Sequence, residues 1–117
     1  MNILITFNHA PYQSSFSNDS LDLALAMAAF DYQVTLLFIN QGVWNLSNTN
    51  HPKHSGLKDF TRLFKGLDLY DIEEVFVEKS ALEQYHLDIN DLLCDVDLLS
   101  PEQLGEFINR FDRVVQL

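Results

Sequence analysis

Short apolar runs, each followed by a segment of helical character, recur along the chain and constrain its fold more than any other feature. The runs are NILITF at residues 2–7, VTLLFI at residues 34–39 and VFV at residues 75–77. Unbroken apolar runs of this length are typical of parallel strands that are buried on both faces. The alternation therefore predicts an α/β fold with a mostly parallel central sheet flanked by helices, in a flavodoxin-like three-layer arrangement.

Helices are predicted between these runs and after the last of them, at residues 19–30, 57–65, 81–84 and from residue 101 onward. Three of these helices have polar residues that can cap an N-terminus: Asn18 or Ser17, Ser80, and Ser100 followed by Pro101. We interpret residues 43–46 as a brief extension of the second strand, and residues 95–99 and 113–117 as further short strands.

The length and the single cysteine limit the class of protein. A chain of 117 residues is long enough for one core, so we expect residues 1–117 to form a single domain. One cysteine excludes an internal disulfide framework and a cysteine-based zinc site. The N-terminus has no signal-peptide pattern and no run is long enough to span a membrane, so we expect a cytoplasmic protein without membrane contact.

The net charge of −10 makes direct binding to nucleic acid an unfavourable hypothesis, because such binding depends on Lys and Arg side chains that meet phosphates. The charge is uneven: residues 57–117 hold fourteen acids and six bases, and residues 88–106 hold six acids and no base. A solvated surface is the simple interpretation of this stretch, and a surface that meets a basic partner is the alternative.

The helix predicted at residues 19–30 is apolar on every side. Between residues 21 and 30 only Asp22 is polar. Alanines on an exposed face would explain this pattern, but we favour an outer face that another subunit covers. The candidate interface residues, which include large side chains near strand ends that could equally be core residues, are Leu21, Leu25, Met27, Phe30, Trp44 and Tyr70.

Few residues indicate a ligand site. His51 and His54 lack the spacing and the further ligands of a metal site. His9 lies at the end of the first strand, a common place for chemistry, but a single histidine there is more often an ordinary loop residue. His86 has no partner that the sequence identifies, so we expect no metal ion. Ser14, Ser15 and Ser17, in the loop of residues 8–18, could donate hydrogen bonds to an anion, although serines are common in any loop. No Gly-rich phosphate loop is present, and we expect no cofactor.

The end of the third strand lacks a nucleophile. In α/β proteins the segment after such a strand is a common place for chemistry, yet here it contains only Glu78 and Lys79 before the next helix. This segment has no Gly-rich turn, no cysteine and no Ser–His pair. Cys94, among leucines and aspartates in DLLCDVDLL, is expected to be a buried thiol of raised pKa and low reactivity.

Several segments together resemble the TusC/DsrF family of DsrE-like sulfur-relay proteins. They are HAPY at residues 9–12, SLDLALAMAAFD at 20–31, LFINQGVWNL at 37–46 and GLDLYDIEEVFV at 66–77, so the resemblance covers essentially the whole chain. It implies a DsrE-like fold and a TusC-like subunit in a heterohexamer with TusB-like and TusD-like homologues. Such a complex passes persulfide sulfur, through a downstream sulfur carrier, toward 2-thiouridine at the wobble position of tRNA.

The resemblance also gives a meaning to the strand end at Glu78 and Lys79. In the TusD-like sister subunit a cysteine lies near the end of the corresponding strand, so this chain resembles a subunit without catalytic activity of its own. Two alternatives stay open: a DsrF-like role in sulfur oxidation, and a stand-alone flavodoxin-like module that binds a ligand.

Overall fold

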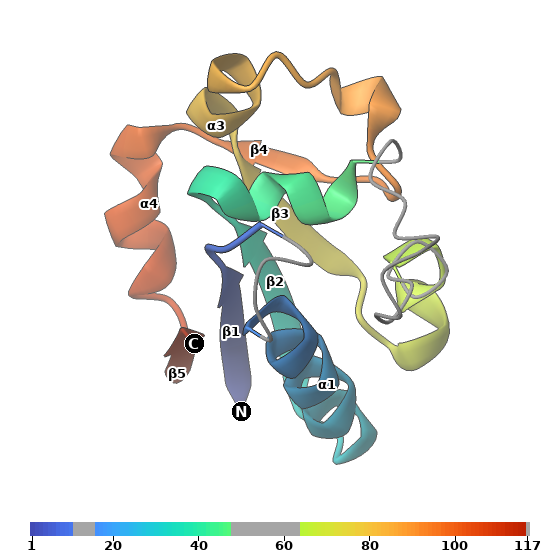
Figure 1. Ribbon diagram of the computed structural model, residues 1–117. Coiled ribbons are helices and arrows are strands. Elements are labelled where there is room, and N and C mark those ends of the chain that lie inside the picture. The colour runs from blue at the N-terminus through green and yellow to red at the C-terminus, as the bar shows by residue number, and fades with distance from the viewer. Residues whose placement is uncertain (11–15, 48–63, 117) are drawn as a thin grey trace.

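The computed structural model describes residues 1–10, 16–47 and 64–116, and its centre is a sheet of five parallel strands (Figure 1). The strands are β1 (Asn2–Phe7), β2 (Gln33–Phe38), β3 (Glu74–Glu78), β4 (Asp97–Leu99) and β5 (Arg113–Gln116). They lie side by side in the order β4-β3-β2-β1-β5, and every pairing is parallel. The predicted fold class is therefore confirmed.

The helices connect the strands in the way that the parallel pairing requires. The α-helices are α1 (Phe16–Ala29), α3 (Lys79–Gln84) and α4 (Pro101–Ile108), and the 3₁₀ helices are η1 (Asn40–Leu46), η2 (Leu67–Tyr70) and η3 (Ile89–Asp91). Most of the helix predicted at residues 57–65 lies outside the described residues, but residues 64 and 65 are helical.

The N-terminus of α4 is formed as its sequence predicts. Ser100 occupies the N-cap, Pro101 follows it, and the Gln103 side chain completes a capping box with the Ser100 backbone N–H at 2.9 Å. Two other capping predictions are wrong. Ser80 lies inside α3, whose N-cap position is Glu78, and Ser17 and Asn18 lie inside α1, which begins at Phe16. Helix boundaries move in this way because neighbouring contacts outweigh local capping preference.

The two faces of the sheet are covered differently. One face packs its alternate strand residues, such as Ile5, Leu36 and Val77, into the larger cluster of core residues together with α1, η1 and α3. The opposite face packs Leu4 and Leu37 into a smaller cluster beneath α4. Figure 1 shows α4 at one side of the sheet, next to β5, and away from α1. Among the described residues, several helices thus cover one face, whereas α4, a helix of eight residues, lies on the other.

Candidate functional site at the carboxyl ends of the strands

Polar side chains join the carboxyl ends of three neighbouring strands. The Asn40 side-chain amide, just after β2, donates to Asn8 Oδ1, just after β1, at 2.6 Å. The Asn40 backbone N–H donates to Glu78 Oε1, at the end of β3, at 3.1 Å. Asn40 has a φ of 50°, in the left-handed region that Asn tolerates better than most residues. This edge, where α/β proteins usually bind ligands, is therefore closed by a chain of hydrogen bonds.

Glu78 has a structural partner at the position where the resemblance implies a cysteine in the sister subunit. Its carboxylate accepts a backbone N–H from the turn after β2, and a carboxylate in this role makes a stronger hydrogen bond than a neutral acceptor. Lys79 is exposed as the first residue of α3. The strand end is thus occupied by a group that holds the backbone, and sequence reasoning missed this role because the partner lies thirty-eight residues away.

The chain after β2 turns back over the end of β1. Residues 43–46 form part of η1, so their interpretation as a strand extension is wrong. The turn is close because Gly42 lies directly against the Phe7 carbonyl group, where no side chain fits. The buried Asn45 amide fixes the turn, since its Nδ2 donates at 2.9 Å both to the His9 carbonyl and to the Gly42 carbonyl.

Asn45 Oδ1 is a second polar feature of this turn that the sequence did not indicate. The residue is 3 % exposed, and Oδ1 is a buried oxygen without a hydrogen-bond partner in the described part of the chain. Buried acceptors are usually paired, directly or through an ordered water molecule. Among the described residues, the Asn45 side chain therefore forms its hydrogen bonds through the amide nitrogen.

Cys94 lies away from this edge. It lines a separate hollow of about 510 Å³, together with Phe64, Ile72 and Val75. Val75 precedes Glu78 by three residues along β3, which corresponds to about 10 Å of strand. Burial first, and then the Asp95 carboxylate, raise the pKa of the Cys94 thiol from 9.0 to about 11. The predicted direction of this pKa shift is confirmed, and the thiolate is scarce at neutral pH.

Those of the candidate ligand residues that the structure describes do not form a recognisable site. His9 follows β1 and contributes its carbonyl to the Asn45 bond, while His86 is exposed at a left-handed position after α3. Within residues 1–10, 16–47 and 64–116, no group of three or more His, Cys, Asp or Glu side chains could hold a metal ion. His51, His54, Ser14 and Ser15 lie outside the described residues, as do the details of Ser17 beyond its place in α1.

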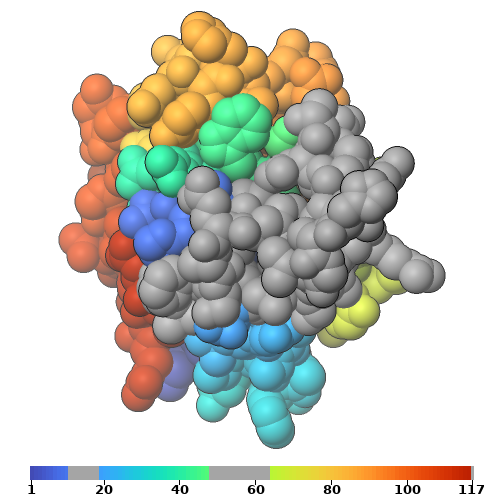
Figure 2. All heavy atoms as spheres, in the orientation of Figure 1, coloured from blue at the N-terminus to red at the C-terminus, as the bar shows by residue number. Residues whose placement is uncertain are grey.

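The candidate interface residues differ in how they meet the surface. Leu21 is fully buried in the core of this chain, so it is not part of an outer face and that assignment is wrong. Leu25 and Met27 are half-buried against the core, whereas Phe30 is 76 % exposed. Side chains of α1 reach the surface at the lower end of the face in Figure 2. An exposed aromatic ring at the end of this helix is what an interface needs.

The two other candidates lie elsewhere on the fold. Tyr70, in η2, is 45 % exposed beside the still more exposed Leu69. Trp44, in η1, is half-buried with its ring centroid 5.6 Å from that of Tyr85. Trp44 therefore joins η1 to α3 within the chain and offers only part of its ring to a partner.

These features define a parallel α/β protein in which the usual ligand edge is held together by carboxylate and amide groups. The chain belongs to the DsrE/DsrF-like family, whose family model matches residues 1–117. The resemblance seen in the sequence is thus confirmed. None of the helices in the described residues is long and apolar enough to cross a membrane.

Individual relatives place the chain more narrowly within this family. It is 35 % identical over 112 residues to a TusC homologue of Haemophilus influenzae, with 94 % of each chain covered. It is 32 % identical to the intracellular sulfur oxidation protein DsrF of Allochromatium vinosum, covering 88 % of this chain and 77 % of that one. The crystal structure of the ychN protein from E. coli superposes with a TM-score of 0.85 at 19 % identity, over 100 % of this chain and 99 % of that chain, which shows a shared fold.

Proposed function

We propose that this chain is a non-catalytic, TusC-like subunit of a sulfur-relay complex that passes persulfide sulfur toward 2-thiouridine at the wobble position of tRNA. Similarity to TusC homologues over almost the whole chain supports the placement among sulfur-relay subunits. The bond from the Asn40 N–H to Glu78 supports the non-catalytic part of the proposal, because it gives the strand end a structural use that a sulfur carrier would not have.

Sulfur transfer itself would require another subunit. A relay cysteine must be accessible and readily ionised, since the thiolate is the nucleophile. Cys94 is half-buried, has a raised pKa and lies at the opposite end of β3 from Glu78. We infer that the sulfur-accepting cysteine belongs to a TusD-like partner.

The partners in this proposal are two homologous subunits, TusB-like and TusD-like, in a heterohexamer. Exposed and half-buried apolar residues of this chain, namely Leu25, Met27, Phe30, Trp44 and Tyr70, are the contacts that we propose for them. With a net charge of −10, this chain would not contact tRNA directly, and the downstream sulfur carrier would act through the complex.

A role in sulfur oxidation is the second candidate. The DsrF relative of Allochromatium vinosum is almost as similar to this chain as the TusC homologues are. The scaffold would have the same structural role in either pathway, because both require a partner that supplies the thiol.

A gene deletion separates the two candidates. The chromosomal copy is removed, and 2-thiouridine in total tRNA is measured by nucleoside mass spectrometry, together with the rate of sulfide oxidation by the cells. Loss of 2-thiouridine, restored by the wild-type chain and by Cys94→Ser, supports the proposal. Loss of sulfide oxidation alone supports the DsrF-like role.

Purification of the tagged chain from the same cells tests the assembly. Two co-purifying homologues, one with an accessible persulfidated cysteine, are expected. A monomer that purifies alone, or a persulfide on Cys94 of this chain, contradicts the proposed scaffold role.

A further inference from the structure

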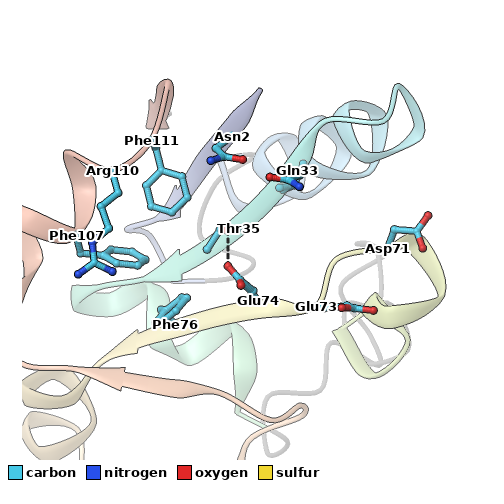
Figure 3. Close-up of a pocket in the computed structure, with 11 residues that line it drawn as sticks. Asn2, Gln33, Thr35, Asp71, Glu73, Glu74, Phe76, Phe107, Arg110 and Phe111 are labelled. Atoms are coloured by element: carbon cyan, nitrogen blue, oxygen red, sulfur yellow. Dashed lines mark hydrogen bonds between the residues drawn. The ribbon is translucent and has the colours of Figure 1, made fainter.

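Within the described residues, the sheet face that carries α4 is only partly covered, and a cleft of about 630 Å³ lies beside this helix (Figure 3). An α4 of eight residues is about 12 Å long, whereas five strands span about 19 Å. One short helix cannot cover such a face. The cleft is therefore a consequence of the fold, and it lies toward the amino ends of β2 and β3, where Gln33 and Glu74 line it.

One wall of the cleft is aromatic. The ring centroid of Phe76, on β3, lies 4.6 Å from that of Phe107, on α4. The ring centroid of Phe111 lies 5.2 Å from that of Phe107. Thr35, which is 4 % exposed, lies between this wall and the acidic residues in Figure 3. These rings offer an apolar contact surface of the kind on which aliphatic stems and guanidinium groups pack.

The remaining wall is acidic. Asp71, Glu73 and Glu74 line it, and Arg110 is the one basic residue among the described residues that line the cleft. Glu74 accepts a hydrogen bond from Thr35 Oγ1 at 3.3 Å, and within the described residues no ion pair joins these carboxylates to Arg110. In the part of the chain that the structure describes, the cleft thus combines buried side chains such as Thr35 and Phe107 with three carboxylates and one guanidinium.

We propose that this cleft is an interaction surface for a segment of a partner protein that presents a Lys or Arg side chain beside an apolar residue. The aliphatic stem and the apolar neighbour would pack on Phe76 and Phe111, and the cationic end would pair with Glu73 and Glu74. The excess of acids over bases in the cleft and the net charge of −10 both favour a basic partner over an acidic one.

The ¹H–¹⁵N NMR spectrum of the full chain, titrated with the peptide acetyl-Leu-Arg-Leu-amide, tests this proposal. Saturable shifts are expected at the amides of Thr35, Glu74 and Phe76. The peptide with Gln in place of Arg should bind at least fivefold more weakly. Added salt should weaken the binding of the Arg peptide, because the charges that attract it are exposed.

Three variants sharpen the test. Glu74→Gln retains an acceptor for Thr35 but removes a charge, so the Kd of the Arg peptide should rise about fivefold or more. Arg110→Gln removes the repelling charge and should lower the Kd, an effect that damage to the fold would not produce. Glu83→Gln, at an exposed position of α3, is the matched control and should leave the Kd unchanged.

Four results would overturn the proposal. The first is that the Arg peptide binds no better than the Gln peptide, and the second is that Glu74→Gln and Arg110→Gln leave the Kd of the Arg peptide unchanged. The third is that free arginine amide binds as tightly as the peptide. The fourth is that the same amide signals shift with protein concentration when no peptide is present. The third result would indicate a small-molecule site, and the fourth a second copy of this chain.

Discussion

Gly42 has no room for a side chain, whereas Gly105 does. Replacing Gly42 with alanine therefore tests the turn over β1, and the same replacement at Gly105 is its control. A Cβ built on Gly42 would lie 1.7 Å from the Phe7 carbonyl oxygen and 2.4 Å from its carbon, whereas a Cβ on Gly105 meets nothing within 4 Å. The same chemical change is therefore made once in a closed site and once in an open one.

The loss of stability expected for Gly42→Ala follows from the backbone atoms that would have to move. Both neighbours are backbone, so the gap to Phe7 has to widen by more than 1 Å for a Cβ to fit. This shift disturbs the bond from the Ile39 N–H to the Phe7 carbonyl, 3.0 Å, and the stacking of Phe7 on Phe38 at 4.5 Å. Overpacking and a lost hydrogen bond together cost about 3–5 kcal/mol of the free energy of unfolding.

Gly105→Ala should have the opposite sign. Gly105 is exposed in the interior of α4, where alanine is favoured over glycine by about 0.5–1 kcal/mol. In a domain whose total stability is about 5–15 kcal/mol, the first substitution removes a large part of the stability and the second adds a little.

Circular dichroism measures both variants beside the wild type at one protein concentration. With a change of about 4–8 °C per kcal/mol, Gly42→Ala should lower the Tm by roughly 15 °C or more, and Gly105→Ala should raise it by a few degrees. A Gly42→Ala protein within about 1 kcal/mol of the wild type would refute the close approach of η1 to β1.

Other predictions concern the strand end, the thiol and the surface. Glu78→Ala should lower the free energy of unfolding by about 0.5–1.5 kcal/mol in urea titrations, through the lost bond to the Asn40 N–H, while 2-thiouridine in cells stays near normal. Lys79→Ala should also leave 2-thiouridine near normal. Cys94 should react with iodoacetamide at pH 8 about 100-fold more slowly than an unperturbed thiol, because its pKa is two units higher. A rate equal to that of a cysteine in an unstructured peptide would contradict this. Since the folded-state pKa of Cys94 is raised, its contribution to stability is complete below pH 9 and is lost as the pH rises toward 11, and Cys94→Ser should abolish this dependence. The isolated chain should self-associate in sedimentation experiments, and Phe30→Ser should reduce this association; a wild-type chain that is monomeric at every concentration would exclude it.

The strands and the start of α4 could be predicted because local sequence determines them. The run of residues 2–7 is apolar on both faces of a central strand, and it forms β1 with the predicted bounds. Ser100 and Pro101 specify a helix N-terminus through contacts within one turn, so no distant residue is needed to interpret them.

The carboxyl edge could not be predicted, because its contacts join residues that are far apart in the sequence. Nothing local distinguishes Glu78 from any exposed glutamate at a strand end, and its role appears only when parallel pairing places β2 beside β3. The same holds for residues 43–46, whose apolar character favours a strand until the close contact of Gly42 with β1 requires a turn. Register and long-range closeness are what the local pattern does not contain.

The carboxyl and amino ends of the sheet differ in how their polar side chains are used. The carboxyl ends of the strands are where α/β proteins commonly carry out chemistry. In this chain, a carboxylate and two side-chain amides there form hydrogen bonds that join the strands. At the amino ends, beside the short α4, lies an open cleft whose carboxylates form no ion pair with Arg110 among the described residues. Under the proposed non-catalytic role, the chain would need surfaces for its partners more than a pocket for a reaction, and joined strand ends with an open opposite end are consistent with that role. The Glu78 carboxylate would then be the residue that adapts a sulfur-relay fold to this role.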